Sequence, residues 1–492
     1  MEKLNKSLLQ SGSLAQGIER GTPPTQVKIL QFGEGNFLRA FIDFFVDELN
    51  EKANWNGGIV AVQPIAQGLT DMINDQAGLY TVYLRGLENN QKTTRKRLIT
   101  SLTECINPYA TFDAYLAQAH NPALSVVISN TTEAGITYVA NDTLAMTPPM
   151  GFPAKITQLL HARFTHFKGD KDKGLVFIPC ELIDNSGDKL KEIVLQHAKD
   201  WQLSAEFTDW INEANYFANT LVDRIVTGYP KDEITAIHEE LGYKDDLVVT
   251  AEIFHFLVLE GKAHELDILK ARFPLHQVSD SIIWTTDATP YKHRKVRILN
   301  GGHTMSVLAA YLHGKDTVGE MMDDPLFQDF LKKGIYEEVI PTLDLDKKDL
   351  EDFAASIFDR FANPFIKHYL LSISLNSVAK FKARVLPTLL TYVDRKGALP
   401  SVITFSLAAL IAFYKGGSRQ VDGTAYEVSD DPEIVGFFAK GWAAGDIPKL
   451  VENTLANESF WGQDLNQVKG LTEAITNHLQ IIETQGILKE GL

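Results

Sequence analysis

The chain has 492 residues, of which 45% are hydrophobic, and its 47 basic and 63 acidic side chains give a net charge of −16. This length predicts more than one compact domain, and the acidic balance argues against a surface that binds nucleic acid or an anionic membrane. Two cysteines are too few for a disulfide framework, and no signal-like apolar segment follows the first residues, so a cytoplasmic protein is expected.

Strand-like runs alternate with helix-like segments in the first half of the chain. The runs are 28–31, 59–63, 79–84, 126–129 and 174–179. Such alternation is typical of a doubly wound α/β sheet. A Rossmann-type, dinucleotide-binding domain is therefore predicted over residues 1–279.

A glycine turn follows the first of these strands and precedes an apolar, helix-like stretch. Gly33 and Gly35 correspond to the first two glycines of a dinucleotide-binding fingerprint, and Leu38 stands at the third. Glycines let backbone amides approach a pyrophosphate, and a helix N-terminus favours its negative charge. The predicted cofactor-binding residues in this turn are Phe32, Gly33, Gly35, Asn36, Phe37 and Leu38.

Two later strand ends complete the predicted nucleotide site. The second strand should present the side chain that binds the ribose, and it ends in Gln63 rather than in an acid, which would favour NAD, or an arginine, which would favour NADP. The choice between the two cofactors is therefore open. The strand at 124–130 ends in Asn130, and we expect Asn130, Thr132 and Glu133 to border the nicotinamide. The alternative for Glu133 is an acid at a helix start.

The second half of the chain has the pattern of amphipathic helices, for example at 326–340, 350–361 and 470–484. After a crossing segment at 280–291, a mostly α-helical substrate and catalytic domain is predicted over residues 280–492. The apolar stretch 402–414 is shorter than a membrane span and is predicted to be a core helix.

The segment from Lys295 to His303 gathers a base, an amide and an imidazole. In an α-helix, at about 100° per residue, Lys295, Asn300 and His303 lie within roughly 140° of one another and can face one cavity. Lysine transfers protons when burial or nearby cations lower its pKa, and Lys292 and Arg297 are close in sequence. An amide and a neutral imidazole can donate hydrogen bonds to a carbonyl oxygen that gains charge. The alternative is a solvated, basic helix start.

Metal ligands are not indicated by the sequence. The 13 histidines form no His-Glu-x-x-His motif, and no Cys-x-x-Cys occurs. A metal-independent reaction with a lysine as acid and base is therefore expected.

Four motifs occur here in the order seen in the mannitol dehydrogenase family, the polyol-specific long-chain dehydrogenases. They are Phe32 to Phe41, Thr132 to Ile136, Val222 to Ile225, and Lys295-x4-Asn300-Gly301-x-His303. The resemblance implies an NAD(H)-dependent oxidoreductase with Lys295 as the acid/base and with Asn300 and His303 polarising the reacting oxygen. It also places Asp223 and Arg224 at the substrate, although an interior ion pair is equally compatible with them. Lys292 stands where family members typically carry an acid, so no proton-relay role is carried over to it.

Four further stretches are most similar to family members that reduce D-tagaturonate to D-altronate in hexuronate (galacturonate) catabolism. They are 241–245, 250–255, 289–291 and 363–382. The implied substrate is a keto-sugar acid, and Lys380, Lys382 and Arg384 are cations suited to its carboxylate, unless they form a solvent-facing basic helix. Reduction of D-fructuronate, oxidation of mannitol, and a catalytically silent sugar-acid or nucleotide sensor remain as alternatives. No protein partner is indicated.

Overall fold

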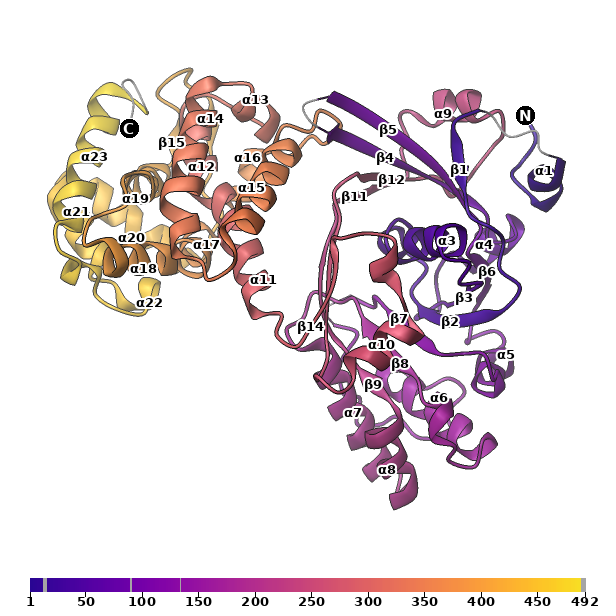
Figure 1. Cartoon of the computed structure of the whole chain (residues 1–492). Coiled ribbons are helices and arrows are strands. Elements are labelled where there is room, and N and C mark those ends of the chain that lie inside the picture. Colours follow the sequence, from indigo (N-terminus) through magenta and orange to yellow (C-terminus); the bar gives the residue numbers. More distant parts are fainter. Residues whose placement is uncertain (12–15, 89–90, 133, 488–492) are drawn as a thin grey trace. The chain divides into compact units, whose positions relative to one another are not determined.

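The computed structural model describes residues 1–11, 16–88, 91–132 and 134–487, and the chain forms two compact units (Figure 1). The first unit comprises Met1–Gly86 and Lys92–Ala288, and the second comprises Leu87–Gln91 and Thr289–Leu492.

Six parallel strands form the central sheet of the first unit. In spatial order they are β6 (Leu102–Ile106), β3 (Gly58–Val62), β2 (Val27–Phe32), β7 (Val126–Ser129), β8 (Val176–Pro179) and β9 (Tyr216–Phe217). Counted along the chain this order is 3-2-1-4-5-6, which is that of a Rossmann fold. Along β2, Ile29 enters one hydrophobic core while Leu30 and Phe32 enter the other, because successive side chains point to opposite faces. The predicted doubly wound domain is confirmed.

Two smaller sheets and a set of helices complete this unit. One sheet has the order β1 (Ile18–Arg20), β5 (Gln91–Ile99), β4 (Tyr80–Glu88), β12 (Val249–Glu252) and β11 (Val226–Gly228), and the other β10 (Asn219–Asp223), β13 (Phe256–Glu260) and β14 (Ile282–Thr285). The helices are α1 (Lys6–Ser11), α2 (Asn36–Arg39), α3 (Ile42–Lys52), α4 (Thr70–Asp75), α5 (Phe112–Ala117), α6 (Phe152–His166), α7 (Ser186–Asp200), α8 (Ala205–Ala214), α9 (Ile234–Leu241) and α10 (Leu266–Arg272), with short 3-10 turns η1 (Gln118–His120), η2 (Lys171–Lys173) and η3 (Leu275–Gln277).

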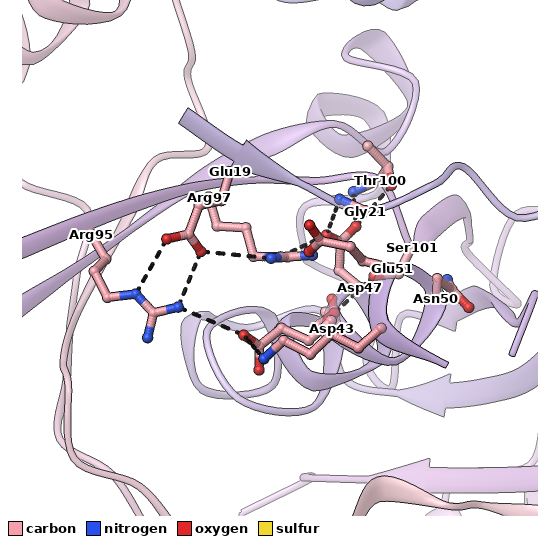
Figure 2. Close-up of polar contacts among 12 residues, drawn as sticks. Glu19, Gly21, Asp43, Asp47, Asn50, Glu51, Arg95, Arg97, Thr100 and Ser101 are labelled. Atoms are coloured by element: carbon pink, nitrogen blue, oxygen red, sulfur yellow. Dashed lines mark hydrogen bonds and ion pairs between the residues drawn. The ribbon is translucent and has the colours of Figure 1, made fainter. Parts of the chain in front are cut away.

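A buried carboxylate ties α3 to the strands β1 and β5 (Figure 2). Oδ1 of Asp47 accepts the Gly21 N–H and the Arg97 Nε–H, each at 2.7 Å, and Oδ2 accepts the Thr100 N–H at 2.7 Å and its hydroxyl at 2.8 Å. The Arg97 guanidinium also binds Glu51 at 2.8 Å. Asp47 is fully buried, so its charge is balanced within this network.

A second buried acid lies beneath the glycine turn. Oδ2 of Asp43 lies 2.8 Å from the Tyr80 hydroxyl, and the Gln31 amide donates to the Gly33 carbonyl at 3.2 Å. The Asp43 and Gln31 side chains contact each other, and Oδ1 of Asp43 and Oε1 of Gln31 are both buried acceptors that lack a partner among the described residues. Burial raises the pKa of Asp43 to about 7, although the contacts with Tyr80 and Gln31 oppose this shift.

Asp43→Asn is therefore expected to remove a pH dependence of stability. The folded carboxyl keeps its proton up to about pH 7, whereas the unfolded one loses it near pH 4, so the wild-type free energy of unfolding should fall by up to about 1.4 kcal/mol per pH unit between these values. The amide that this substitution introduces does not titrate in this pH range. Urea unfolding of both proteins from pH 5 to 8 measures the difference, and parallel curves for the two would contradict a protonated Asp43.

The second unit is built of helices. They are α11 (Thr289–Arg294), η4 (Lys295–Asn300), α12 (Gly301–Leu312), α13 (Val318–Met322), α14 (Pro325–Lys332), η5 (Lys333–Val339), η6 (Ile340–Thr342), α15 (Lys347–Phe361), α16 (Leu370–Ser374), α17 (Ser377–Arg384), α18 (Leu386–Lys396), α19 (Ser401–Phe413), α20 (Pro432–Ala443), α21 (Ile447–Leu455), α22 (Glu458–Trp461), η7 (Leu465–Gln467) and α23 (Leu471–Gln485), with one small hairpin of β15 (Gly417–Ser418) and β16 (Ala425–Tyr426). The predicted helix at 326–340 is in fact divided into α14, the π-helix η5 and a 3-10 turn. The mostly helical character predicted for this part of the chain is confirmed.

The apolar stretch predicted as a core helix is α19, and it is buried from Val402 to Phe413. Among the described residues, no helix is both long and apolar enough to cross a membrane. Within the same ranges, no three His, Cys, Asp or Glu side chains are grouped as metal ligands would be.

Candidate active site

The glycine turn lies at the carboxyl end of β2. Gly33 has φ +116°, and its N–H donates to the Val62 carbonyl at 3.1 Å. A Cβ on Gly33 would lie 2.9 Å from the Asn130 carbonyl oxygen, so both the conformation and the approach of β7 require glycine here. Gly35 is exposed, and a Cβ built on it would meet nothing within 4 Å. The turn therefore leaves open space in front of its backbone, as a pyrophosphate requires.

The end of β7 lies against this turn. The Asn130 amide donates to the Cys180 carbonyl at 2.7 Å, which fixes the strand end. Thr132 has φ +69°, a strained conformation for a β-branched residue and one that occurs often at functional sites. The predicted residue Glu133 lies outside the described residues. Gly33, Asn130 and Thr132 are thus positioned at neighbouring ends of β2 and β7, where a Rossmann fold binds its ligand.

The other residues predicted in the turn have side chains that support it. Phe32 packs edge-on against Phe152 in the core, and Phe37 stacks on Phe41. Leu38 is buried, and Oδ1 of Asn36 accepts a hydrogen bond from Arg39 at 2.7 Å. If Phe32 and Leu38 contact the cofactor, they do so through their backbones.

Gln63 is not available to a ribose in the way the sequence suggested. Its amide donates to the Ile65 carbonyl at 2.8 Å and the Ala66 carbonyl at 2.9 Å, and its Oε1 accepts the Thr70 hydroxyl at 2.8 Å. The side chain is buried and shapes the loop that follows β3. Because these bonds run between a strand end and its own loop, no pattern in the sequence identifies them.

In the second unit, Lys295 begins a π-helix, not the α-helix assumed from the sequence. The Gly301 N–H donates to the Val296 carbonyl, five residues earlier, as in a π-turn. Lys295 and Asn300 are also five residues apart, so one π-turn places them on the same side of the helix, closer in direction than an α-helix would allow. Such turns are rare and frequently occur at functional sites.

His303 lies one turn further, in α12. Its ring stacks on Phe361 with centroids 4.0 Å apart, and it meets the His368 ring edge-on at 5.4 Å. Nε2 of His303 is buried and has no hydrogen-bond partner among the described residues. Burial, together with the nearby His368 and Arg360, holds the pKa of His303 well below its usual range. The imidazole is therefore neutral, with one nitrogen left for a ligand.

The three basic residues of α17 lie on different sides of the helix. The charges of Lys380 and Arg384 reach His303 and contribute to its lowered pKa, whereas Lys382 is exposed and lies beside Gly462 at the end of α22. Positions two apart on a helix point in opposite directions. Lys380 donates to the Ile373 carbonyl at 2.8 Å, and the half-buried Arg384 guanidinium has no hydrogen bond or ion pair in the part of the chain that the structure describes.

Arg224 forms hydrogen bonds with the backbone inside the first unit. It donates to the carbonyls of Ala40, Glu252 and Ile253 at 2.7, 3.0 and 3.2 Å, and its guanidinium lies over the Phe44 ring. Asp223 is buried at the end of β10. These contacts are with backbone carbonyls, so the interior ion pair and the contact with a substrate both stay predictions.

Three residues that surround His303 were not predicted from the sequence. Arg360 and Phe361 end α15, a regular amphipathic helix in which nothing singles them out, and His368 lies in the segment before α16. All three reach His303 only through the packing of helices that are distant in sequence.

Two family domains match this chain. The one described as the mannitol dehydrogenase Rossmann domain matches residues 27–270, and the one described as the mannitol dehydrogenase C-terminal domain matches residues 287–483. The chain belongs to the mannitol dehydrogenase family. The family resemblance predicted from the sequence is therefore confirmed.

Relatives within the mannitol dehydrogenase family are similar over most of their length. Proteins named altronate oxidoreductase from Enterobacter sp. (strain 638) and Klebsiella pneumoniae (strain 342) are each 47% identical over 466 residues, which is 94% of this chain and 95% of theirs. A D-sorbitol dehydrogenase has the same fold, with a TM-score of 0.81 at 23% identity over 99% of both chains. Mannitol 2-dehydrogenase of Pseudomonas fluorescens, in a ternary complex with NAD and D-mannitol, gives 0.64 at 22% identity over 99% of this chain and 98% of its own.

Proposed function

We propose that this protein is an altronate oxidoreductase, which reversibly reduces D-tagaturonate to D-altronate with NADH. The 47% identity to proteins of that name over 94% of the chain carries the proposal. The unpaired Arg384 guanidinium beside Lys380 and His303 supports a substrate with a carboxylate over a neutral polyol, because a guanidinium binds a carboxylate with two hydrogen bonds.

The first unit fits a nicotinamide cofactor. The turn at Gly33 and Gly35 offers the pyrophosphate an open backbone, and Asn130 and Thr132 mark the strand end where the nicotinamide would lie. When bound, the cofactor supplies or accepts the hydride at the substrate carbon.

In the second unit, Lys295 donates a proton to the ketone oxygen during reduction and takes it back from the hydroxyl during oxidation. Asn300 and the neutral His303 donate hydrogen bonds to the same oxygen as its negative charge grows. The buried, unpartnered Nε2 of His303 supports this role, because a ligand oxygen would satisfy it.

Arg384→Gln should raise the KM for D-altronate by about 10- to 100-fold, since one charge-assisted contact to the carboxylate is lost. The KM for D-mannitol, which has no carboxylate, should not change. Steady-state rates of NAD reduction with D-altronate, D-mannonate and D-mannitol measure both effects. Lys382→Ala is the matched control, because it removes a cation from the other side of α17. Equal effects of the two substitutions would argue against a carboxylate site at Arg384.

A further inference from the structure

The sequence of β3 leaves the ribose site without an acid. In a Rossmann fold the acidic side chain at the end of the second strand accepts hydrogen bonds from the adenosine ribose. Here that strand is followed by Gln63, whose amide is engaged with its own loop. The loop from residue 63 to 69 contains no acidic or basic residue.

Glu34 brings a carboxylate to this place from the neighbouring turn. It lies between Gly33 and Gly35, and its Oε1 accepts the Leu69 N–H at 3.2 Å. A Cβ on Gly68 would lie 2.2 Å from this oxygen and 2.5 Å from Oε1 of Gln63. The carboxylate of Glu34 therefore occupies the end of β3 beside Gln63, in space that exists because residue 68 is glycine.

Within the part of the chain that the structure describes, no lysine or arginine forms an ion pair with the buried Glu34 carboxylate. The guanidinium of Arg39 donates to the Glu34 and Leu247 carbonyls and to the Asn36 side chain, not to the carboxylate. Burial raises the pKa of Glu34, while the Leu69 N–H and the Arg39 charge oppose this shift.

We propose that Glu34 binds the ribose hydroxyls of the adenosine and makes the protein selective for NAD(H) over NADP(H). This inference rests on the proposed function in that it assumes a nicotinamide dinucleotide at the glycine turn. The 2′-hydroxyl of NAD can donate a hydrogen bond to the carboxylate. The 2′-phosphate of NADP would meet a negative charge with no lysine or arginine in the adjoining loop to compensate it.

The test is titration of the full-length protein with NADH and with NADPH, without sugar, followed by nucleotide fluorescence. Wild type should bind NADH about 10- to 100-fold more tightly than NADPH, and Glu34→Gln, which keeps the size and the Leu69 contact, should reduce this ratio about tenfold. Gly68→Ala should also weaken NADH binding, because its methyl group displaces a carboxylate that keeps its charge. Asp209→Asn, an exposed acid on α8, is the control for the loss of one negative charge and should leave the ratio unchanged.

If Glu34 had only a structural role, Glu34→Gln would weaken the binding of NADH and NADPH equally. An unchanged ratio of the two affinities in this variant therefore overturns the inference. Equal affinities of the wild-type protein for NADH and NADPH would also overturn the inference. If the protein binds neither, the proposed function fails with it. If NADH binds selectively but no sugar acid turns over, the substrate assignment fails while the role of Glu34 stands.

Discussion

Lys295→Ala is expected to lower kcat for D-tagaturonate reduction by about 100- to 10,000-fold, the usual contribution of a positioned general acid. Lys295 begins the π-helix that also carries Asn300, and His303 follows in α12. Without the ammonium group, only water is left to protonate the oxygen, while the amide and imidazole still bind it. The loss should therefore fall on kcat, with the Kd for NADH unchanged.

Steady-state kinetics with NADH titrations for wild type and variant measure both quantities. Lys382→Ala, an exposed lysine of the same unit, should retain full kcat. Activity of Lys295→Ala within a few-fold of wild type would assign the proton transfer to another group.

Asp47→Ala should lower the free energy of unfolding of the first unit by at least about 5 kcal/mol. Removing one partner of a buried ion pair costs about 3–5 kcal/mol, and each buried donor left without an acceptor adds about 1–3 kcal/mol. Here the Arg97 guanidinium, the Gly21 N–H and both donors of Thr100 lose their acceptor (Figure 2). The remaining contact of Arg97 with Glu51 compensates only in part.

Glu19→Gln is the control from the rim of the same network. Glu19 pairs with Arg95 at 3.1 Å and with Arg97 at 3.7 Å, and its side chain is 42% exposed. Exposed pairs contribute less than about 1 kcal/mol, so this variant should unfold close to wild type. Urea unfolding monitored by amide exchange in α3 and β5 separates the two units. Equal stabilities of Asp47→Ala and Glu19→Gln would mean that the buried carboxylate does not hold α3 to the strands.

The parts of the fold that the sequence predicted correctly depend on local pattern. Strand-like runs bounded by turn residues identified β2, β3, β7 and β8, and Gly33 was singled out by a motif whose physical basis, a left-handed backbone and a close approach, the structure shows. The amphipathic period likewise identified α15 and α23.

The rest depends on tertiary contacts. Nothing in the residues from Lys295 to Asn300 distinguishes a π-turn from an α-turn. The sequence also does not separate Lys382 from the other basic residues of α17, because its position beside Gly462 depends on the packing of α22. Gln63 stood at the expected ribose position, yet its hydrogen bonds turn it inward. Glu34, which was not predicted as a site residue, reaches that place through the gap at Gly68.

Rates of NADH oxidation with D-tagaturonate, D-fructuronate and D-fructose at equal concentrations distinguish a sugar-acid reductase from an enzyme that reduces neutral ketoses. We expect the highest kcat/KM with D-tagaturonate and little turnover of the uncharged ketose, because the carboxylate contact at Arg384 is then missing. A preference for D-fructose would contradict a sugar-acid reductase, and a preference for D-fructuronate would contradict the assignment to altronate.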